Sequence, residues 1–219
     1  MNENTVTISV DAGEVMSRVG RLFDRHPTGI VLEIFQNARR AGASYIKAEI
    51  GDDSTLLIGN DGEEIDDWSS LVTLGRNGWD TDTRASEDPA GMGAFVLAYF
   101  QEASVYSMGS ALHLGRDDFV EGTEIGLQSA PVPMDNCTTV YRLHDPVIRR
   151  DNFGSAVQEA ARHFPIPVYL NGEECERTDP ADRNGHSKTV MGFRLFQIRE
   201  GVTYGHRSML NFHGHLISI

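Results

Sequence analysis

The sequence predicts an α+β fold in which helices accompany a mainly antiparallel sheet, and three observations support this prediction. Apolar residues recur with the helical period in segments 12–24, 30–41 and 151–163. Apolar and polar residues alternate across 101–143, in runs such as SVYSM and TTVYRL, which is typical of strands. A polar turn, GDDS at 51–54, separates two further strand-like segments and predicts a hairpin.

The first part of the chain is expected to contain two helices and this hairpin. The breaker HPTG at 26–29 separates helix 12–24 from helix 30–41. Gly42 is expected to end the second helix, because glycine readily adopts the backbone conformation that follows a helix. The hairpin then spans about 45–58.

The middle of the chain contains a long segment without apolar periodicity. Residues 66–74 suit a short helix, whereas 75–90 are rich in Gly, Asp and Thr and predict a long loop. Loops of this length inside a domain are uncommon and usually functional. This loop leads into GMG at 91–93 and the apolar segment 94–100, which predicts a glycine turn that opens a buried helix.

The rest of the chain completes one domain and begins another. The sheet at 101–143, the helix at 151–163 and a strand at 166–170 complete a first domain that we place at 1–172. Residues 173–219 mix turn signals with short strand-like pieces, which predicts the β-rich, truncated start of a second domain. A length of 219 residues suits one full domain with a partial addition.

Composition disfavours several classes of protein. The chain carries 32 acidic and 19 basic residues, and its formal net charge of −13 disfavours docking on nucleic acid or anionic membrane. No apolar run approaches the ~20 residues of a membrane span. The N-terminus lacks the pattern of a secretory signal, so we expect a cytoplasmic protein with reduced cysteines, Cys137 and Cys175.

The candidate functional residues begin in VLEIFQNARRAGA, residues 31–43. Glu33 lies one helical turn before Asn37, so both side chains project from one face of the helix. A carboxylate can activate water and an amide oxygen can bind Mg²⁺, and nucleotide hydrolysis needs both. On its own such a pair is more often a solvated helix face, so its interpretation depends on the rest of the chain.

Two glycine turns supply that context. GNDGEEI at 59–65 follows a strand, and Gly62 lets the backbone approach a flat base. Gly91 and Gly93 precede a helix, whose free N–H groups favour phosphate. Each turn is a weak signal alone. Their order is specific: acid-and-amide helix, strand, polar glycine turn, long loop, glycine turn into a helix, and Thr-rich strand.

That order, with these residues, resembles the GHKL ATPase superfamily, and it is closer to the gyrase B, MutL and chaperone branches than to the sensor histidine kinases. EIFQNA at 33–38 matches the family motif ExxxNA, and GMGAFVL at 91–97 matches GxGxxxL. Thr138 falls on a family threonine that touches the adenine-binding acid, with Cys137 in place of a glycine. The resemblance covers about residues 10–172 and implies the Bergerat ATP-binding fold, a two-layer α/β sandwich with a mixed sheet.

The sequence departs from the family at its base-binding box, DxGxG, which aligns with NDGEE at 60–64. Asn60 replaces an aspartate that accepts a hydrogen bond from the adenine amino group. An amide oxygen can still accept that bond, but it lacks the negative charge. Glu64 replaces the second glycine, and Asp61 is a candidate to assist adenine binding.

The resemblance implies Mg²⁺-dependent binding and slow hydrolysis of ATP. Glu33 would activate the attacking water, Asn37 would bind Mg²⁺, and loop 75–90 would close as a lid. Nucleotide binding would drive a conformational change or homodimerisation within a larger protein. The expected ATP-binding residues are Asn37, Arg40, Asn60, Asp61, Gly62, Ile65, Gly91, Met92, Gly93, Ala94 and Thr138.

Three alternatives stay open at this point. Arg40 either faces the phosphates or is a surface arginine favoured by the dipole at the end of a helix. Asn60 and Glu64 also suit a degenerate nucleotide-sensing or interaction module without turnover, although Glu33 argues against it. A GHKL protein kinase is less favoured, because the 32 residues before Glu33 leave no room for a phosphoacceptor helical hairpin.

Overall fold

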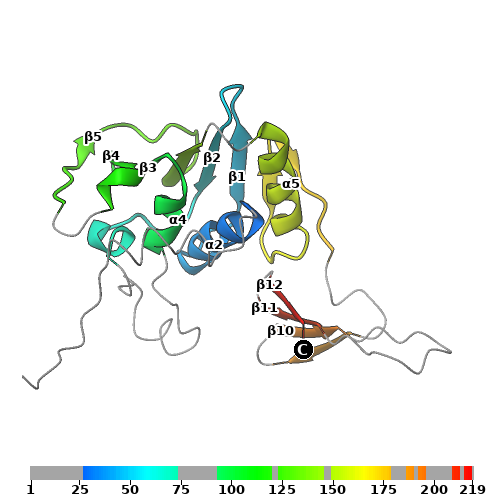
Figure 1. Ribbon diagram of the computed structural model, residues 1–219. Coiled ribbons are helices and arrows are strands. Elements are labelled where there is room, and N and C mark those ends of the chain that lie inside the picture. Colours follow the sequence, from blue (N-terminus) through cyan, green and yellow to red (C-terminus); the bar gives the residue numbers. More distant parts are fainter. Residues whose placement is uncertain are drawn as a thin grey trace, which may run out of the picture.

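The structure is a computed structural model, and it confirms the predicted α+β class with a mixed eight-stranded sheet and helices (Figure 1). It describes residues 27–73, 93–119, 123–145 and 149–178, together with the backbone of four strands at 186–189, 192–195, 209–212 and 215–218. The predicted helix at 12–24 and the predicted loop at 75–90 lie outside the described residues. None of the helices in the described part is long and apolar enough to cross a membrane.

The main sheet has the strand order β5-β4-β3-β6-β2-β1-β7-β8. Its strands are β1 (Ile46–Ile50), β2 (Thr55–Asn60), β3 (Glu102–Ser107), β4 (Ser110–Gly115), β5 (Gln128–Ser129), β6 (Thr139–His144), β7 (Val168–Leu170) and β8 (Glu173–Glu174). The β1–β7 pair is parallel and the other pairs of this sheet are antiparallel. Because β6 lies between β2 and β3, residues distant in sequence meet at one end of the sheet.

Helix α2 (Pro27–Arg40) begins earlier than the predicted start at residue 30. Proline fits the first turn of a helix, because it has no N–H to leave unpaired there and its φ is already helical. Gly42 ends the helix as expected, with a φ of 72°. The N–H of Gly42 donates to the Arg39 carbonyl at 3.0 Å and that of Ala43 to the Ala38 carbonyl at 3.1 Å, which is the Schellman arrangement.

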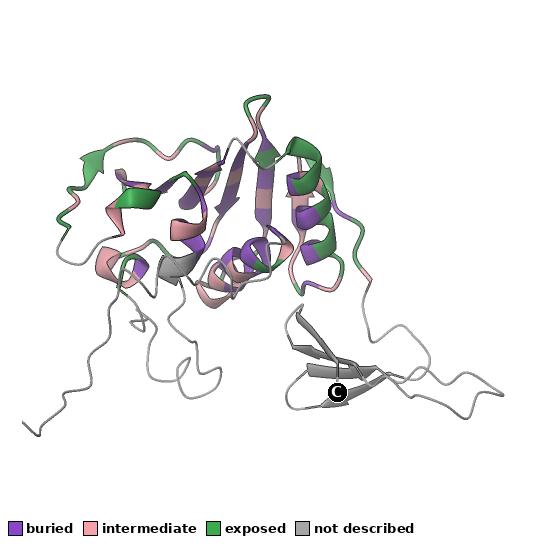
Figure 2. Ribbon diagram, in the orientation of Figure 1, coloured by how far each residue is buried: buried purple, intermediate pink, exposed green. Residues whose placement is uncertain are grey.

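The core lies between the sheet and the helices α2, α4 (Gly93–Tyr99) and α5 (Arg150–Ala161). Figure 2 shows the buried positions of α2 and α5 turned toward the strands. Phe35 of α2 packs against Phe164 with ring centroids 5.4 Å apart, and Phe153 of α5 stacks on Phe100 at 6.2 Å. This packing holds α2 over the sheet and leaves one polar stripe of the helix outside the core.

Two further features differ from or extend the sequence prediction. The described part of the predicted helix 66–74 contains a short 3₁₀ helix, η1 (Trp68–Leu71), and a second one, η2 (Arg116–Asp118), follows β4. A separate four-stranded antiparallel sheet has the order β12-β11-β10-β9. Its strands are β9 (His186–Thr189), β10 (Gly192–Leu195), β11 (Met209–Phe212) and β12 (His215–Ser218). The main sheet continues through β8, just past residue 172, and the domain division stays a prediction.

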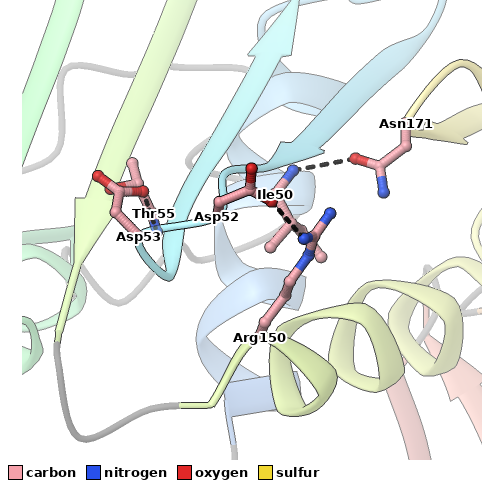
Figure 3. A network of polar contacts seen from close by, with 6 residues as sticks. All are labelled: Ile50, Asp52, Asp53, Thr55, Arg150 and Asn171. Carbon is pink, nitrogen blue, oxygen red and sulfur yellow. Dashed lines mark hydrogen bonds and ion pairs between the residues drawn. The ribbon is translucent and has the colours of Figure 1, made fainter.

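A polar network holds the end of β1 and β2 opposite to Asn60 (Figure 3). The Asn171 side chain accepts a hydrogen bond from the Ile50 N–H at 3.0 Å. Arg150, at the start of α5, donates to Asp52 in the β1–β2 turn at 2.6 Å. These contacts tie the turn to the helix and to the β7–β8 connection, so we interpret them as structural.

Candidate functional site

Three polar side chains form a stripe along α2. Glu33, Asn37 and Arg40 follow one another at helical spacing and share one face of the helix. Arg40 Nη1 donates to Asn37 Oδ1 at 3.1 Å and lies 3.7 Å from Glu33 Oε1. The Arg40 side chain is only 10% exposed and that of Glu33 is 27% exposed. Arg40 is therefore part of this α2 stripe, and its guanidinium contacts the oxygen expected to bind Mg²⁺.

The Glu33 end of the stripe lies near the middle of the sheet, where Tyr141 projects from β6. Burial of Tyr141, and then the negative charge of Glu33, raise the pKa of the tyrosine to about 12, so its phenol is neutral at physiological pH. Within the described residues the Tyr141 hydroxyl has no hydrogen-bond partner. The sequence did not point to Tyr141, because strand alternation does not reveal which helix covers a strand.

A row of buried polar side chains lies at one end of β2, β6 and β3. Asn60 is paired with Thr139, and Thr139 is paired with Ser107. Their exposed fractions are 3%, 3% and 0%. Paired residues share a face of the sheet. This face is the helix-covered one, because Ile58 and Tyr141, two residues along their strands, belong to the core. We call these three residues the strand-end row.

The strand-end row organises the polar turn that follows β2. Asn60 Oδ1 accepts a hydrogen bond from the Gly62 N–H at 3.0 Å. Ser107 Oγ accepts one from the N–H of Ile65 at 3.0 Å and lies 3.1 Å from Thr139 Oγ1. The strand-end row therefore holds both ends of the segment 60–65, which the sequence predicts to bind the base.

Thr138 and Thr139 have different surroundings. The Thr138 hydroxyl donates to the carbonyls of Gly62 and Asn60, and its N–H donates to Asn60 O at 2.8 Å. Thr138, which the resemblance placed against the adenine-binding acid, thus contacts the turn backbone. Thr139 is the threonine paired with Asn60. The alternation in TTVYRL places Thr139 with Tyr141 and was the available signal, whereas nothing in the sequence pointed to Ser107.

Asp61 makes contacts within the protein. Its carboxylate accepts hydrogen bonds from the N–H groups of Ser44 at 2.8 Å and Tyr45 at 3.1 Å, and from the Ser44 hydroxyl. Burial alone would raise the pKa of Asp61, but these hydrogen bonds outweigh burial and lower it. Asp61 therefore ties the turn to the segment after α2, which favours Asn60 over Asp61 as the group that faces a base.

Gly62 is required by packing against α2. A Cβ at this position would lie 2.7 Å from the Ala41 carbonyl oxygen and 3.0 Å from Asn60 Oδ1. The Glu63 N–H donates to the same Ala41 oxygen at 2.7 Å. The turn thus rests on the end of α2 and adjoins the α2 stripe. Glu64, which replaces the second glycine of the family box, is exposed.

The predicted phosphate-binding turn is described only in part. α4 begins at Gly93, and Gly93 and Ala94 have helical backbone. Gly91 and Met92 lie outside the described residues. The phosphate contacts of this turn stay a prediction.

The donor atoms of the α2 stripe fit Mg²⁺. Magnesium prefers oxygen ligands and usually takes one or two from the protein, with phosphates and waters completing the set. The Asn37 amide oxygen is such a ligand, and Arg40 now donates to it. In the part of the chain that the structure describes, no group of three or more His, Cys, Asp or Glu residues could hold a metal ion. A magnesium ion at Asn37 would therefore need further oxygen ligands from the phosphates of a bound molecule.

Comparisons with known proteins find matches among solved structures. No family model matches the chain, and no curated protein matches it. Among solved structures, the chain is similar to the ATPase region of Saccharomyces cerevisiae topoisomerase II, with 16% sequence identity and a TM-score of 0.48. The match covers 71% of this chain and 50% of that chain. The function proposed below therefore rests on the geometry of the site.

Proposed function

We propose that the chain is a Mg²⁺-dependent ATP-binding domain of the GHKL type that hydrolyses ATP slowly. The observation that carries the proposal is the contact between the α2 end and the turn after β2, where Glu63 donates to Ala41 O at 2.7 Å. This contact holds the end of the helix that carries Glu33 and Asn37 against the turn whose buried neighbours would bind a base. Water activation, metal binding and base binding would then share one site.

At the phosphate end, Glu33 would act as the general base and Asn37 would ligate magnesium. A bound Mg²⁺ neutralises phosphate charge, and positioning with charge neutralisation carries most of phosphoryl transfer. Arg40 lies close enough to both residues to exchange its present contacts for a phosphate oxygen. Such exchange is favourable because arginine binds phosphate through a planar fork of donors.

At the base end, Asn60 is the group best placed to bind adenine. Its Oδ1 accepts the Gly62 N–H, and a carbonyl oxygen retains a second lone pair for another donor. The exocyclic amino group of adenine is such a donor. Thr139 and Ser107 extend this hydrogen-bonding surface beyond Asn60.

Within a larger protein, such a domain would couple nucleotide binding to a conformational change or to homodimerisation. The proposed division at residue 172 would separate the ATP-binding part from the start of a transducing domain. Loop 75–90 would serve as the lid, and the protein would act in the cytoplasm.

Calorimetric titration with a non-hydrolysable ATP analogue, with and without Mg²⁺, tests this function. We expect Mg²⁺-dependent binding by the wild type and loss of the Mg²⁺-dependent part in Asn37→Ala. Asn152→Ala, at an exposed position on α5, is the matched control and should bind like the wild type. Absence of binding at millimolar analogue would refute the proposal and favour an interaction module without turnover, the alternative that Asn60 and Glu64 support.

A further inference from the structure

Among the residues that the structure describes, the buried hydrogen-bond donors of Asn60 have no acceptors. Its Oδ1 accepts the Gly62 N–H at 3.0 Å, and only the oxygen of the amide can accept that bond, so the orientation of the amide is set. The residue is 3% exposed. In the described part of the chain, the Asn60 NH₂ group has no hydrogen-bond acceptor.

The hydroxyl pair next to Asn60 adds another donor. Ser107 Oγ accepts the Ile65 N–H, and it shares a single hydrogen bond with Thr139 Oγ1 at 3.1 Å. Two hydroxyl hydrogens are present, but only one can lie between these two oxygens. Whichever residue donates, the other hydroxyl retains a hydrogen that has no acceptor among the described residues.

Buried donors without acceptors are costly, so an excess of them indicates a ligand that presents acceptors. The Asn60 amide can pair with the edge of adenine or with the edge of a 6-oxopurine, because it both donates and accepts. The remaining hydroxyl donor distinguishes the two bases. It finds an acceptor on the second lone pair of a 6-carbonyl oxygen, whereas the amino group of adenine presents only donors there.

We propose that the base end of this site is not selective for adenine and binds a 6-oxopurine nucleotide, such as GTP or ITP, at least as tightly as ATP. The inference rests on the proposed function, because it concerns the base of the same nucleotide. An aspartate at position 60 would lack the NH₂ donors and would repel a 6-carbonyl oxygen. Asn60 is therefore a specificity-determining residue.

The test is calorimetric titration of the full chain with the β,γ-imido analogues of ATP and GTP in Mg²⁺. We expect the wild type to bind the GTP analogue as tightly as the ATP analogue or more tightly. In Asn60→Asp, the affinity for the GTP analogue relative to the ATP analogue should fall by about tenfold or more. The new carboxylate oxygen and the 6-carbonyl oxygen of the base are both acceptors, and no donor would lie between them. Asn152→Asp adds the same charge at an exposed site on α5 and should leave the ratio unchanged.

A second variant covers the case in which Asn60→Asp does not fold. Thr139→Val removes the hydroxyl next to Asn60 without adding charge, and it should weaken binding of the GTP analogue several-fold relative to binding of the ATP analogue. Wild-type preference for the ATP analogue by tenfold or more would overturn the inference and leave the ATPase proposal standing. If neither variant changed the ratio of the two affinities from its wild-type value, that result would also overturn the inference and leave the ATPase proposal standing. Absence of binding by either analogue would refute the proposed function together with this inference.

Discussion

The two halves of the candidate site differ in how the chain builds them. The α2 stripe lies within one helix, carries charge and is partly exposed, and its members contact one another. The strand-end row comes from three strands, is uncharged and is almost fully buried. One half is therefore local and partly buried, and the other is non-local and almost fully buried.

This difference determines what each half can tolerate. The Arg40 guanidinium can leave the Asn37 amide oxygen for another partner, because a bound phosphate would compensate the lost contact. A buried donor has no such alternative, and each unsatisfied one costs about 1–3 kcal/mol. We therefore expect substitutions in the α2 stripe to alter turnover and Mg²⁺ dependence. Substitutions in the strand-end row or in the turn after β2 should alter the preference for one base over another and the stability of the fold.

The largest expected effect breaks the chemistry of the α2 stripe. Glu33→Ala should lower turnover by roughly 10²–10⁴-fold, the usual contribution of a general base, and should leave binding of the ATP analogue intact. Phosphate release and calorimetry measure the two quantities. Glu49→Ala removes an exposed carboxylate of β1 and should retain wild-type turnover. Unchanged turnover in Glu33→Ala would mean that another group activates the water.

The next effect tests the contact that joins the two halves. Gly62→Ala should lower the free energy of unfolding by about 1–3 kcal/mol, because the new Cβ would lie 2.7 Å from a backbone oxygen of Ala41. Denaturant unfolding measures this change. Gly29→Ala is the control, since a Cβ at Gly29 meets nothing within 4 Å, and in a helix it should stabilise by about 0.5–1 kcal/mol. Equal stability of Gly62→Ala and the wild type would contradict close packing of the turn on α2.

A smaller effect sharpens the interpretation of the α2 stripe. Arg40 contacts the Asn37 oxygen that we assign to Mg²⁺, so Arg40→Gln should lower the Mg²⁺ concentration for half-maximal analogue binding by up to about tenfold. Calorimetry across a Mg²⁺ series gives this midpoint. Arg39→Gln loses the same charge from the same turn, but Arg39 bonds to Gln36 at 3.1 Å, so its midpoint should resemble that of the wild type. Equal midpoints in the two variants would exclude competition at Asn37.

The smallest effect concerns Asp61 and pH. Because the folded protein lowers the pKa of Asp61, its ionised form stabilises the fold above the unfolded pKa of about 4, and this contribution is lost as pH falls through the folded pKa. Asp61→Asn should be less stable than the wild type at neutral pH, and the gap should shrink in acid. Urea midpoints across this range measure it. A gap independent of pH would show that the charge is not what Ser44 and Tyr45 stabilise.

Local patterns predicted the parts of the fold that depend on short-range geometry. The hairpin of β1 and β2, the helix α5 and the end of α2 at Gly42 all lie close to their predicted positions. The start of α2 was predicted too late, because Pro27 was interpreted as a breaker although it suits a first helical turn. The short helix predicted at 66–74 is a 3₁₀ helix over Trp68–Leu71, which is a common form for a single helical turn between other elements.

The sequence by itself determined the α2 stripe, because 3.6 residues per turn place Glu33, Asn37 and Arg40 on one face wherever that helix packs. Only the tertiary structure decided the strand-end row. Its members meet because β6 lies between β2 and β3, and the register of those strands pairs Asn60 with Thr139 and not with Thr138. A shift of one residue turns every side chain of a strand to the opposite face, and this choice depends on packing across the whole sheet.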